Sequence, residues 1–143
     1  MFKKILLPLD LSNKHQTALR TATELARQNN SEVILLHVVE EIPGLSREEE
    51  KDFYSRLERT ARCQLAHLES QFTRDKIPCR TEVILGHRAV ETARFAAQNK
   101  VDLILLTSPP FQREHTMVVL GSMTWKLGMI ASCPVLLVKN QET

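Results

Sequence analysis

The stretch EVILLHVV, residues 32–39, decides the fold class of this chain. It does not alternate between apolar and polar residues, which is typical of a strand that is covered on both faces. A second run of the same kind lies between Val101 and Leu106. Because such short runs are separated by longer segments with apolar residues at helical spacing, the sequence predicts a parallel sheet with helices on both of its faces.

The expected elements follow from the same periodicities. The predicted strands are Lys4 to Pro8, Glu32 to Val39, Arg80 to Leu85, Val101 to Leu106 and Val135 to Val138. The first predicted helix begins after Ser12 or Asn13, either of which can cap it. Three further helices are predicted from Arg47 to Phe72, from His87 to Gln98 and from Ser122 to Ala131. The helix residues expected in the core include Leu57, Leu65, Val90 and Ile130. Residues 1–143 are predicted to form one domain.

Composition excludes several functional classes. The chain is 43% hydrophobic and 25% charged, with a net charge of +2, so we expect a globular protein without a nucleic-acid footprint. The apolar run near the start ends at Pro8 and Asp10, too early for a signal peptide, and no stretch is long enough for a membrane helix. Three cysteines, Cys63, Cys79 and Cys133, form no C-x-x-C pair, so we expect free thiols and a cytoplasmic location.

Several strings, taken together and in order, resemble the universal stress protein family over essentially the whole chain. The most specific are GSMT at residues 121–124 and SCPVLLV at residues 132–138, supported by ILLPLD at residues 5–10. The resemblance implies an adenine nucleotide alpha hydrolase-like α/β fold. That fold is an open, doubly wound, five-stranded parallel sheet of strand order 3-2-1-4-5, with four helices divided between its faces. It also implies a homodimer joined through the edge strand from Pro134 to Val138, which would otherwise be left uncovered.

In the nucleotide-binding branch of that family, the loop after the fourth strand has the form G-x-x-G, nine residues, then G-S or G-T. Gly121 and Ser122 match the end of this motif, but its first two glycines fall near Thr107 and Pro110, with ten residues before Gly121. Shifting the frame by one restores the spacing but supplies no glycine either.

Two prolines, Pro109 and Pro110, occupy this loop, where a phosphate cradle would need backbone N–H donors. Proline has no N–H group and a fixed φ, so neither residue can donate to a phosphate. Each such hydrogen bond contributes about 1.5 to 3 kcal/mol. Losing two would weaken ATP binding by about 3 to 6 kcal/mol, on the order of a hundredfold to ten-thousandfold.

If a nucleotide does bind, the resemblance places it against Asp10, Val38, Gly121, Ser122 and Thr124. Each has a second interpretation. Asp10 is equally well a turn-forming carboxylate, and Val38 an ordinary strand residue. Ser122 is equally well a plain helix cap, although the start of a helix also favours an anion.

Other chemistries find little support. In the loop from Ser108 to Leu120, Arg113 and His115 could form a different anion site, but exposed charges are usually just solvated. No histidine spacing indicates a metal site, and no nucleophile elbow or Walker loop is present, so we expect neither a metal nor catalysis. An enzyme whose site is built from residues distant in sequence stays an alternative. Turnover of a nucleotide or thioester substrate that is lost on changing Asp10 would indicate it.

We therefore interpret the sequence as a dimeric, cytoplasmic universal stress protein that acts through contacts with other proteins and lacks tight ATP binding. Its expected partners are a second copy and unidentified proteins, with neither nucleic acid nor membrane involved. The alternative is an ATP-binding member of the family with a variant loop and, at most, slow hydrolysis.

Overall fold

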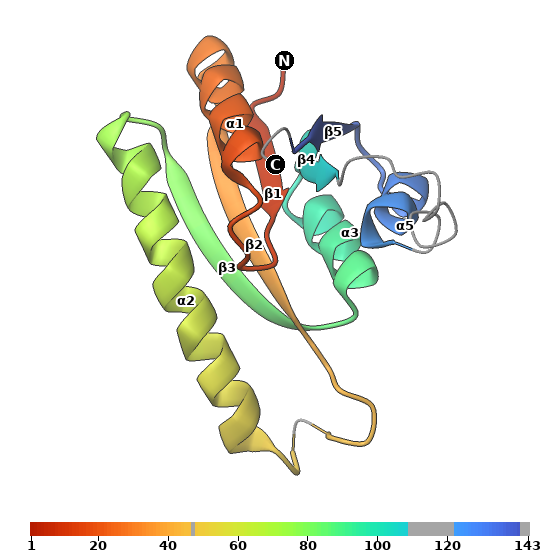
Figure 1. Ribbon diagram of the computed structural model, residues 1–143. Helices are drawn as coiled ribbons and strands as arrows, with labels where there is room; N and C mark the ends of the chain where they lie inside the picture. The colour runs from red at the N-terminus through yellow and green to blue at the C-terminus, as the bar shows by residue number, and fades with distance from the viewer. Residues whose placement is uncertain (47, 109–121, 141–143) are drawn as a thin grey trace.

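The computed structural model describes residues 1–46, 48–108 and 122–140. Its five-stranded sheet has the order β3-β2-β1-β4-β5, with parallel pairing throughout, as the resemblance implied (Figure 1). The strands are β1 (Lys4–Pro8), β2 (Glu32–Glu40), β3 (Cys79–Gly86), β4 (Leu103–Ser108) and β5 (Val135–Lys139). Four of the five predicted ranges are confirmed to within one residue at each end.

The fourth strand begins two residues later than predicted. The Val101 N–H donates to the carbonyl of Ala96 at 2.9 Å, so Val101 takes part in the turn that follows the preceding helix rather than in the sheet. The Asp102 carboxylate then accepts hydrogen bonds from the backbone N–H groups of Lys3 and Lys4, at 2.8 and 3.1 Å. Ladder pairing therefore starts at Leu103, opposite Ile5.

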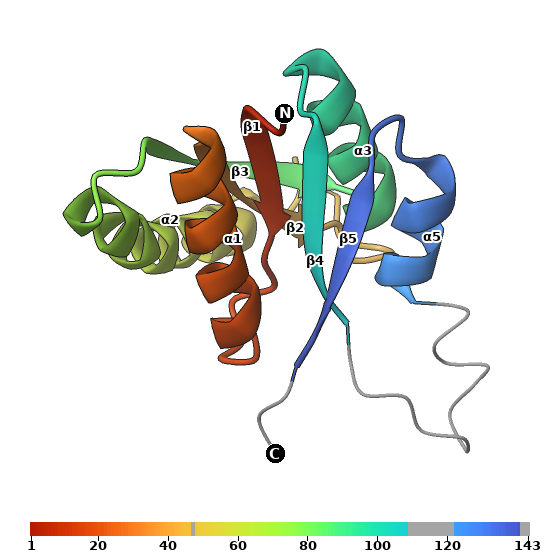
Figure 2. The same cartoon turned by 90° about the horizontal axis from the view of Figure 1, so that it is seen from above.

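The described helices divide between the two faces of the sheet (Figures 1 and 2). They are α1 (Gln16–Asn29), α2 (Lys51–Arg74), α3 (Arg88–Gln98) and α5 (Met123–Ile130). Helices α1 and α2 pack on one face, and α3 and α5 on the other. The doubly wound arrangement predicted from the sequence is confirmed.

Neighbouring residues of the central strands serve two separate cores. In β2, Val33 and Leu35 pack toward α1 and α2, whereas Ile34 and Leu36 pack toward α3 and α5, and all four are fully buried. Burying an aliphatic side chain of this size contributes about 1.5 to 3 kcal/mol relative to exposure. A helix layer on each face thus explains why residues 32–39 show no polar alternation.

The predicted helix stripes are partly wrong. Leu57, Val90 and Ile130 were expected in the core, but they are 38%, 42% and 50% exposed. On α2 the buried residue of the first turns is Tyr54, because its hydroxyl group is anchored to the backbone of residues 42 and 45. On α3 the buried residues include Thr92, which helical spacing had not singled out.

Gly128 lies inside α5, and an added Cβ at this position would meet no atom within 4 Å. Glycine costs about 1 kcal/mol relative to alanine in an exposed helix interior. We therefore expect Gly128→Ala to raise the free energy of unfolding by about 0.5 to 1 kcal/mol, measured by chemical denaturation. A decrease would contradict the open surroundings that the structure gives this residue.

Candidate functional site

A cavity of about 230 Å³ opens at the carboxyl ends of β1 and β4, the edge where ligands bind in open α/β sheets. It brings together the predicted site residues Asp10, Val38, Ser122 and Thr124. Gly121, like Pro109 and Pro110, lies outside the described residues. Residues that are 114 positions apart in the sequence, Asp10 and Thr124, therefore share one site.

Asp10 follows β1, and groups of its own loop surround its carboxylate. Oδ1 accepts hydrogen bonds from the backbone N–H and the hydroxyl of Ser12, at 3.0 and 2.7 Å. Nε2 of His15 lies 2.7 Å from the same oxygen, and the Lys14 ammonium lies 2.7 Å from Oδ2. The hydrogen bond from His15 is the main reason why the pKa of Asp10 is held well below its usual range. Burial opposes this lowering, while Lys14 and Ser12 add to it.

These contacts also correct the predicted cap of the first helix. Neither Ser12 nor Asn13 is its N-cap residue, because Ser12 instead closes a turn onto Asp10. The helix begins at Gln16, and the residue in the N-cap position is His15, whose side chain makes no capping hydrogen bond. The turn-forming interpretation of Asp10 therefore describes its contacts in the structure.

His15 is a site residue that the sequence analysis missed. Its side chain is buried, and its Nδ1 lies 2.7 Å from the hydroxyl oxygen of Thr107 on β4. It therefore connects the loop after β1 to the end of β4. The sequence signal was a histidine five residues after the strand-end aspartate, but nothing in that spacing indicated a partner 92 residues away.

The start of α5 forms another wall of the cavity. Ser122 is the N-cap residue of α5, and its hydroxyl oxygen accepts a hydrogen bond from the Trp125 N–H at 3.3 Å. The capping interpretation of Ser122 is thus confirmed. Met123 and Thr124, in the first helical turn, line the same cavity. The first N–H groups of a helix lack intrahelical partners and favour an anion.

Two cations that the sequence analysis did not single out, Lys14 and Arg88, also line this cavity. They give it positive charge, and Asp10 is the one carboxylate among the described residues that line it. Arg113 and His115, considered as an anion site from the sequence, lie outside the described residues. Within the ranges that the structure describes, no three His, Cys, Asp or Glu side chains are grouped so that they could hold a metal ion.

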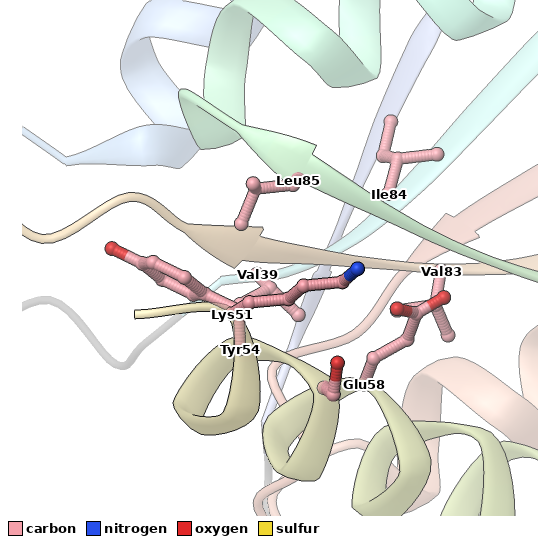
Figure 3. A pocket seen from close by; sticks show the side chains of 8 residues that line it. Val39, Lys51, Tyr54, Glu58, Val83, Ile84 and Leu85 are labelled. Atoms are coloured by element: carbon pink, nitrogen blue, oxygen red, sulfur yellow. The ribbon is translucent and has the colours of Figure 1, made fainter. Parts of the chain in front are cut away.

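A larger cavity, of about 360 Å³, lies between α2 and the strands β2 and β3 (Figure 3). Lys51, Tyr54 and Glu58 project from α2 toward the strands that carry Val39 and Val83. The Tyr54 hydroxyl is already bonded to Ile42 N and Leu45 O, and Glu58 is paired with Arg62 at 2.8 Å. Because Tyr54 and Glu58 are engaged and none of the predicted site residues lines this larger cavity, the smaller cavity is the better candidate.

The cysteines do not contribute to either cavity. All three are free, as predicted: Cys63 is exposed, whereas Cys79 and Cys133 are partly buried. Burial raises the pKa of Cys79 to about 12, with a smaller contribution from Glu69 and Glu32. Burial also raises the pKa of Cys133, which keeps both thiols protonated and unreactive near neutral pH.

Comparison with known proteins identifies the family. The model of the universal stress protein family matches residues 1–139, so the chain belongs to that family. It is 30% identical to the universal stress protein MJ0531 of Methanocaldococcus jannaschii, over 99% of this chain and 85% of the relative. It is 25% identical to the universal stress protein MJ0577 of the same organism, over 100% of this chain and 98% of the relative.

Solved structures agree with this assignment. The structure of MJ0577 superposes with a TM-score of 0.83, covering 100% of this chain and 99% of that one, at 26% identity. A universal stress protein of Archaeoglobus fulgidus in complex with dAMP superposes with a TM-score of 0.69 at 20% identity, covering 97% and 100% of the two chains. The adenine nucleotide alpha hydrolase-like fold is thereby confirmed. No helix in the described part of the chain is long and apolar enough to span a membrane.

Proposed function

We propose that this universal stress protein is a dimeric, cytoplasmic stress-response factor that acts through contacts with other proteins and lacks tight ATP binding. The observation that carries the proposal is the engagement of Asp10: hydrogen bonds from Ser12 and His15 and the ion pair with Lys14 occupy both of its oxygens. A nucleotide would have to displace part of this set. Pro109 and Pro110 add to the cost, because they offer no N–H to a phosphate. The role needs no turnover of a substrate.

A titration with Mg-ATP, followed by thermal denaturation, tests this proposal. A ligand at 100 times its dissociation constant adds about 2.7 kcal/mol to stability, which is easily detected as a rise in Tm. We expect no saturable rise at submillimolar ATP. A clear saturable rise there would overturn the proposal of weak binding.

The second candidate function is nucleotide binding with a variant loop and at most slow hydrolysis. The observation that favours it is the cavity itself, which places Val38, Ser122 and Thr124 beside the two cations Lys14 and Arg88. The dAMP complex of the Archaeoglobus fulgidus relative supports the same idea for the family. A saturable ATP shift that disappears in Asp10→Asn would establish this candidate over the first.

The proposed homodimer rests on the exposed apolar side chains of α5 and β5. Leu136 and Leu137 of the edge strand β5 are 39% and 45% exposed, and Trp125 and Met129 of α5 are 50% and 71% exposed. An uncovered edge strand with apolar side chains is an aggregation hazard that a second copy would remove. The strand from Pro134 to Val138 is therefore the proposed interface.

Sedimentation at micromolar concentration tests the dimer. We expect the wild-type protein to sediment as a dimer and Leu137→Lys to sediment as a monomer, because a charge would be buried at the interface. Leu57→Lys, the same change at an exposed leucine of α2, should leave the dimer intact. A monomeric wild-type protein would refute the proposal.

A further inference from the structure

Asp10, His15 and Thr107 form a continuous hydrogen-bonded chain of carboxylate, imidazole and hydroxyl. The two links, from Oδ1 of Asp10 to Nε2 of His15 and from Nδ1 of His15 to Oγ1 of Thr107, are both 2.7 Å long. His15 is only 7% exposed, so its ring is held between the two partners and away from solvent. Thr107 is partly exposed and lines the cavity.

The direction of each hydrogen bond follows from the charge of Asp10. An ionised carboxylate can only accept, so Nε2 of His15 carries a proton and donates to Asp10. In the neutral imidazole Nδ1 then holds a lone pair, and the Thr107 hydroxyl donates to it. This tautomer makes His15 a base that is already bonded to the proton of a hydroxyl group, with a carboxylate orienting the ring from behind.

The surroundings supply the other parts of a site for acyl transfer. The first turn of α5, at Met123 and Thr124, lines the same cavity and presents N–H groups without intrahelical partners, which are suited to a developing oxyanion. Leu36, Val38 and Leu106 give the cavity an apolar wall. The cavity has a volume of about 230 Å³, and together with its apolar wall this suits a short apolar acyl group.

We propose that Thr107 is a nucleophile and that Asp10, His15 and Thr107 form an acyl-transfer site for carboxylic esters with a short apolar acyl group. Oγ1 of Thr107 attacks the carbonyl carbon while its proton passes to Nδ1 of His15. The bond from the carbonyl carbon to the alcohol oxygen breaks, and the alcohol leaves with the proton from His15. Water then attacks the acyl-threonine ester, with His15 taking the proton and returning it to Thr107, so that acid and alcohol are the products. The activity is additional to the proposed stress-response role and does not depend on ATP.

The test uses p-nitrophenyl acetate with the purified full-length protein. We expect a burst of p-nitrophenolate and, by peptide mass spectrometry, an acetyl group on Thr107. Thr107→Val, which removes the hydroxyl but keeps the shape, should lose both signals. Thr107→Ser should keep them. Thr21→Val is the matched control, because the Thr21 hydroxyl donates to the Thr17 carbonyl within α1 and lines neither cavity, so this variant should behave as the wild type.

His15→Gln tests the base, and we expect it to slow acylation by a factor of about 100 or more. Circular dichroism of each variant separates a lost base from a lost fold. If His15→Gln unfolds, a fluorophosphonate provides the test instead. Labelling of Thr107 in the wild type, with no labelling of Thr107→Val, would support the proposal without the His15 variant. Two results together would overturn the proposal. The first is acetylation that is confined to lysines and equal in the wild type and Thr107→Val, and the second is the absence of fluorophosphonate labelling at Thr107.

Discussion

Leu65→Ala should lower the free energy of unfolding by about 3 kcal/mol. Leu65 of α2 is fully buried in the core on this face of the sheet, and the truncation leaves a cavity that the strands packed against α2, β2 and β3, cannot fill. The loss of stability includes both the lost transfer free energy of the removed atoms and the free energy of the cavity left behind. Urea denaturation at neutral pH, with the m-value checked for constancy, measures this difference.

Leu57→Ala, two helical turns earlier on α2, is the matched control. Its side chain is 38% exposed, so the same truncation should cost less than about 1 kcal/mol. Both leucines belong to the stripe that periodicity predicts, and only the structure distinguishes them. Equal losses for the two variants would contradict the burial described above.

Asp10→Asn should lower the free energy of unfolding by about 2 kcal/mol at pH 7, the typical value of hydrogen bonds to a charged group. The pKa of Asp10 is lower in the folded protein than in the unfolded chain, chiefly because His15 donates to it. A lowered folded-state pKa stabilises the protein above the unfolded pKa, about 4, and this contribution is lost as the pH falls further. The difference between wild type and variant should therefore shrink below about pH 4.

Denaturation of both proteins between pH 7 and the acid range measures this difference. Asp52→Asn, at an exposed carboxylate in the first turn of α2, is the control and should cost less than about 1 kcal/mol at pH 7. A gap between wild type and Asp10→Asn that widened toward acid pH would show that Asp10 is not held as an ionised group in the folded protein.

The fold was largely predictable because it depends on local hydrophobic patterns. Runs such as residues 32–39 and 103–106 report burial on both faces directly, so the patterns predicted where the strands lie. The order of the strands was implied by the family resemblance, and the structure confirms it. Helix faces were less predictable. Leu57 is exposed while Tyr54, three residues earlier on α2, is buried and anchored by residues 42 and 45, a contact that helical spacing does not report.

The contacts of the site were predictable only where they involve residues close together in the sequence. Ser122 caps a helix and Asp10 forms a turn just after a strand, and both local features are confirmed. The pairing of His15 with Thr107 was not predictable, because it depends on β1 and β4 lying next to each other in the sheet. Histidine spacing within the sequence carries no information about such a contact.

The strand order has a consequence for how the chain folds as it is made. Strand β1 leaves the ribosome before the other strands of this sheet, and it can pair with β2 early, through Ile5 and Val33. Its other side pairs with Leu103 and Ile104, which are synthesised almost a hundred residues later. Until then a nascent chain would leave this apolar central edge of the sheet unpaired, and unpaired strand edges favour aggregation. Translation speed through residues 40–100 should therefore govern the yield of native protein.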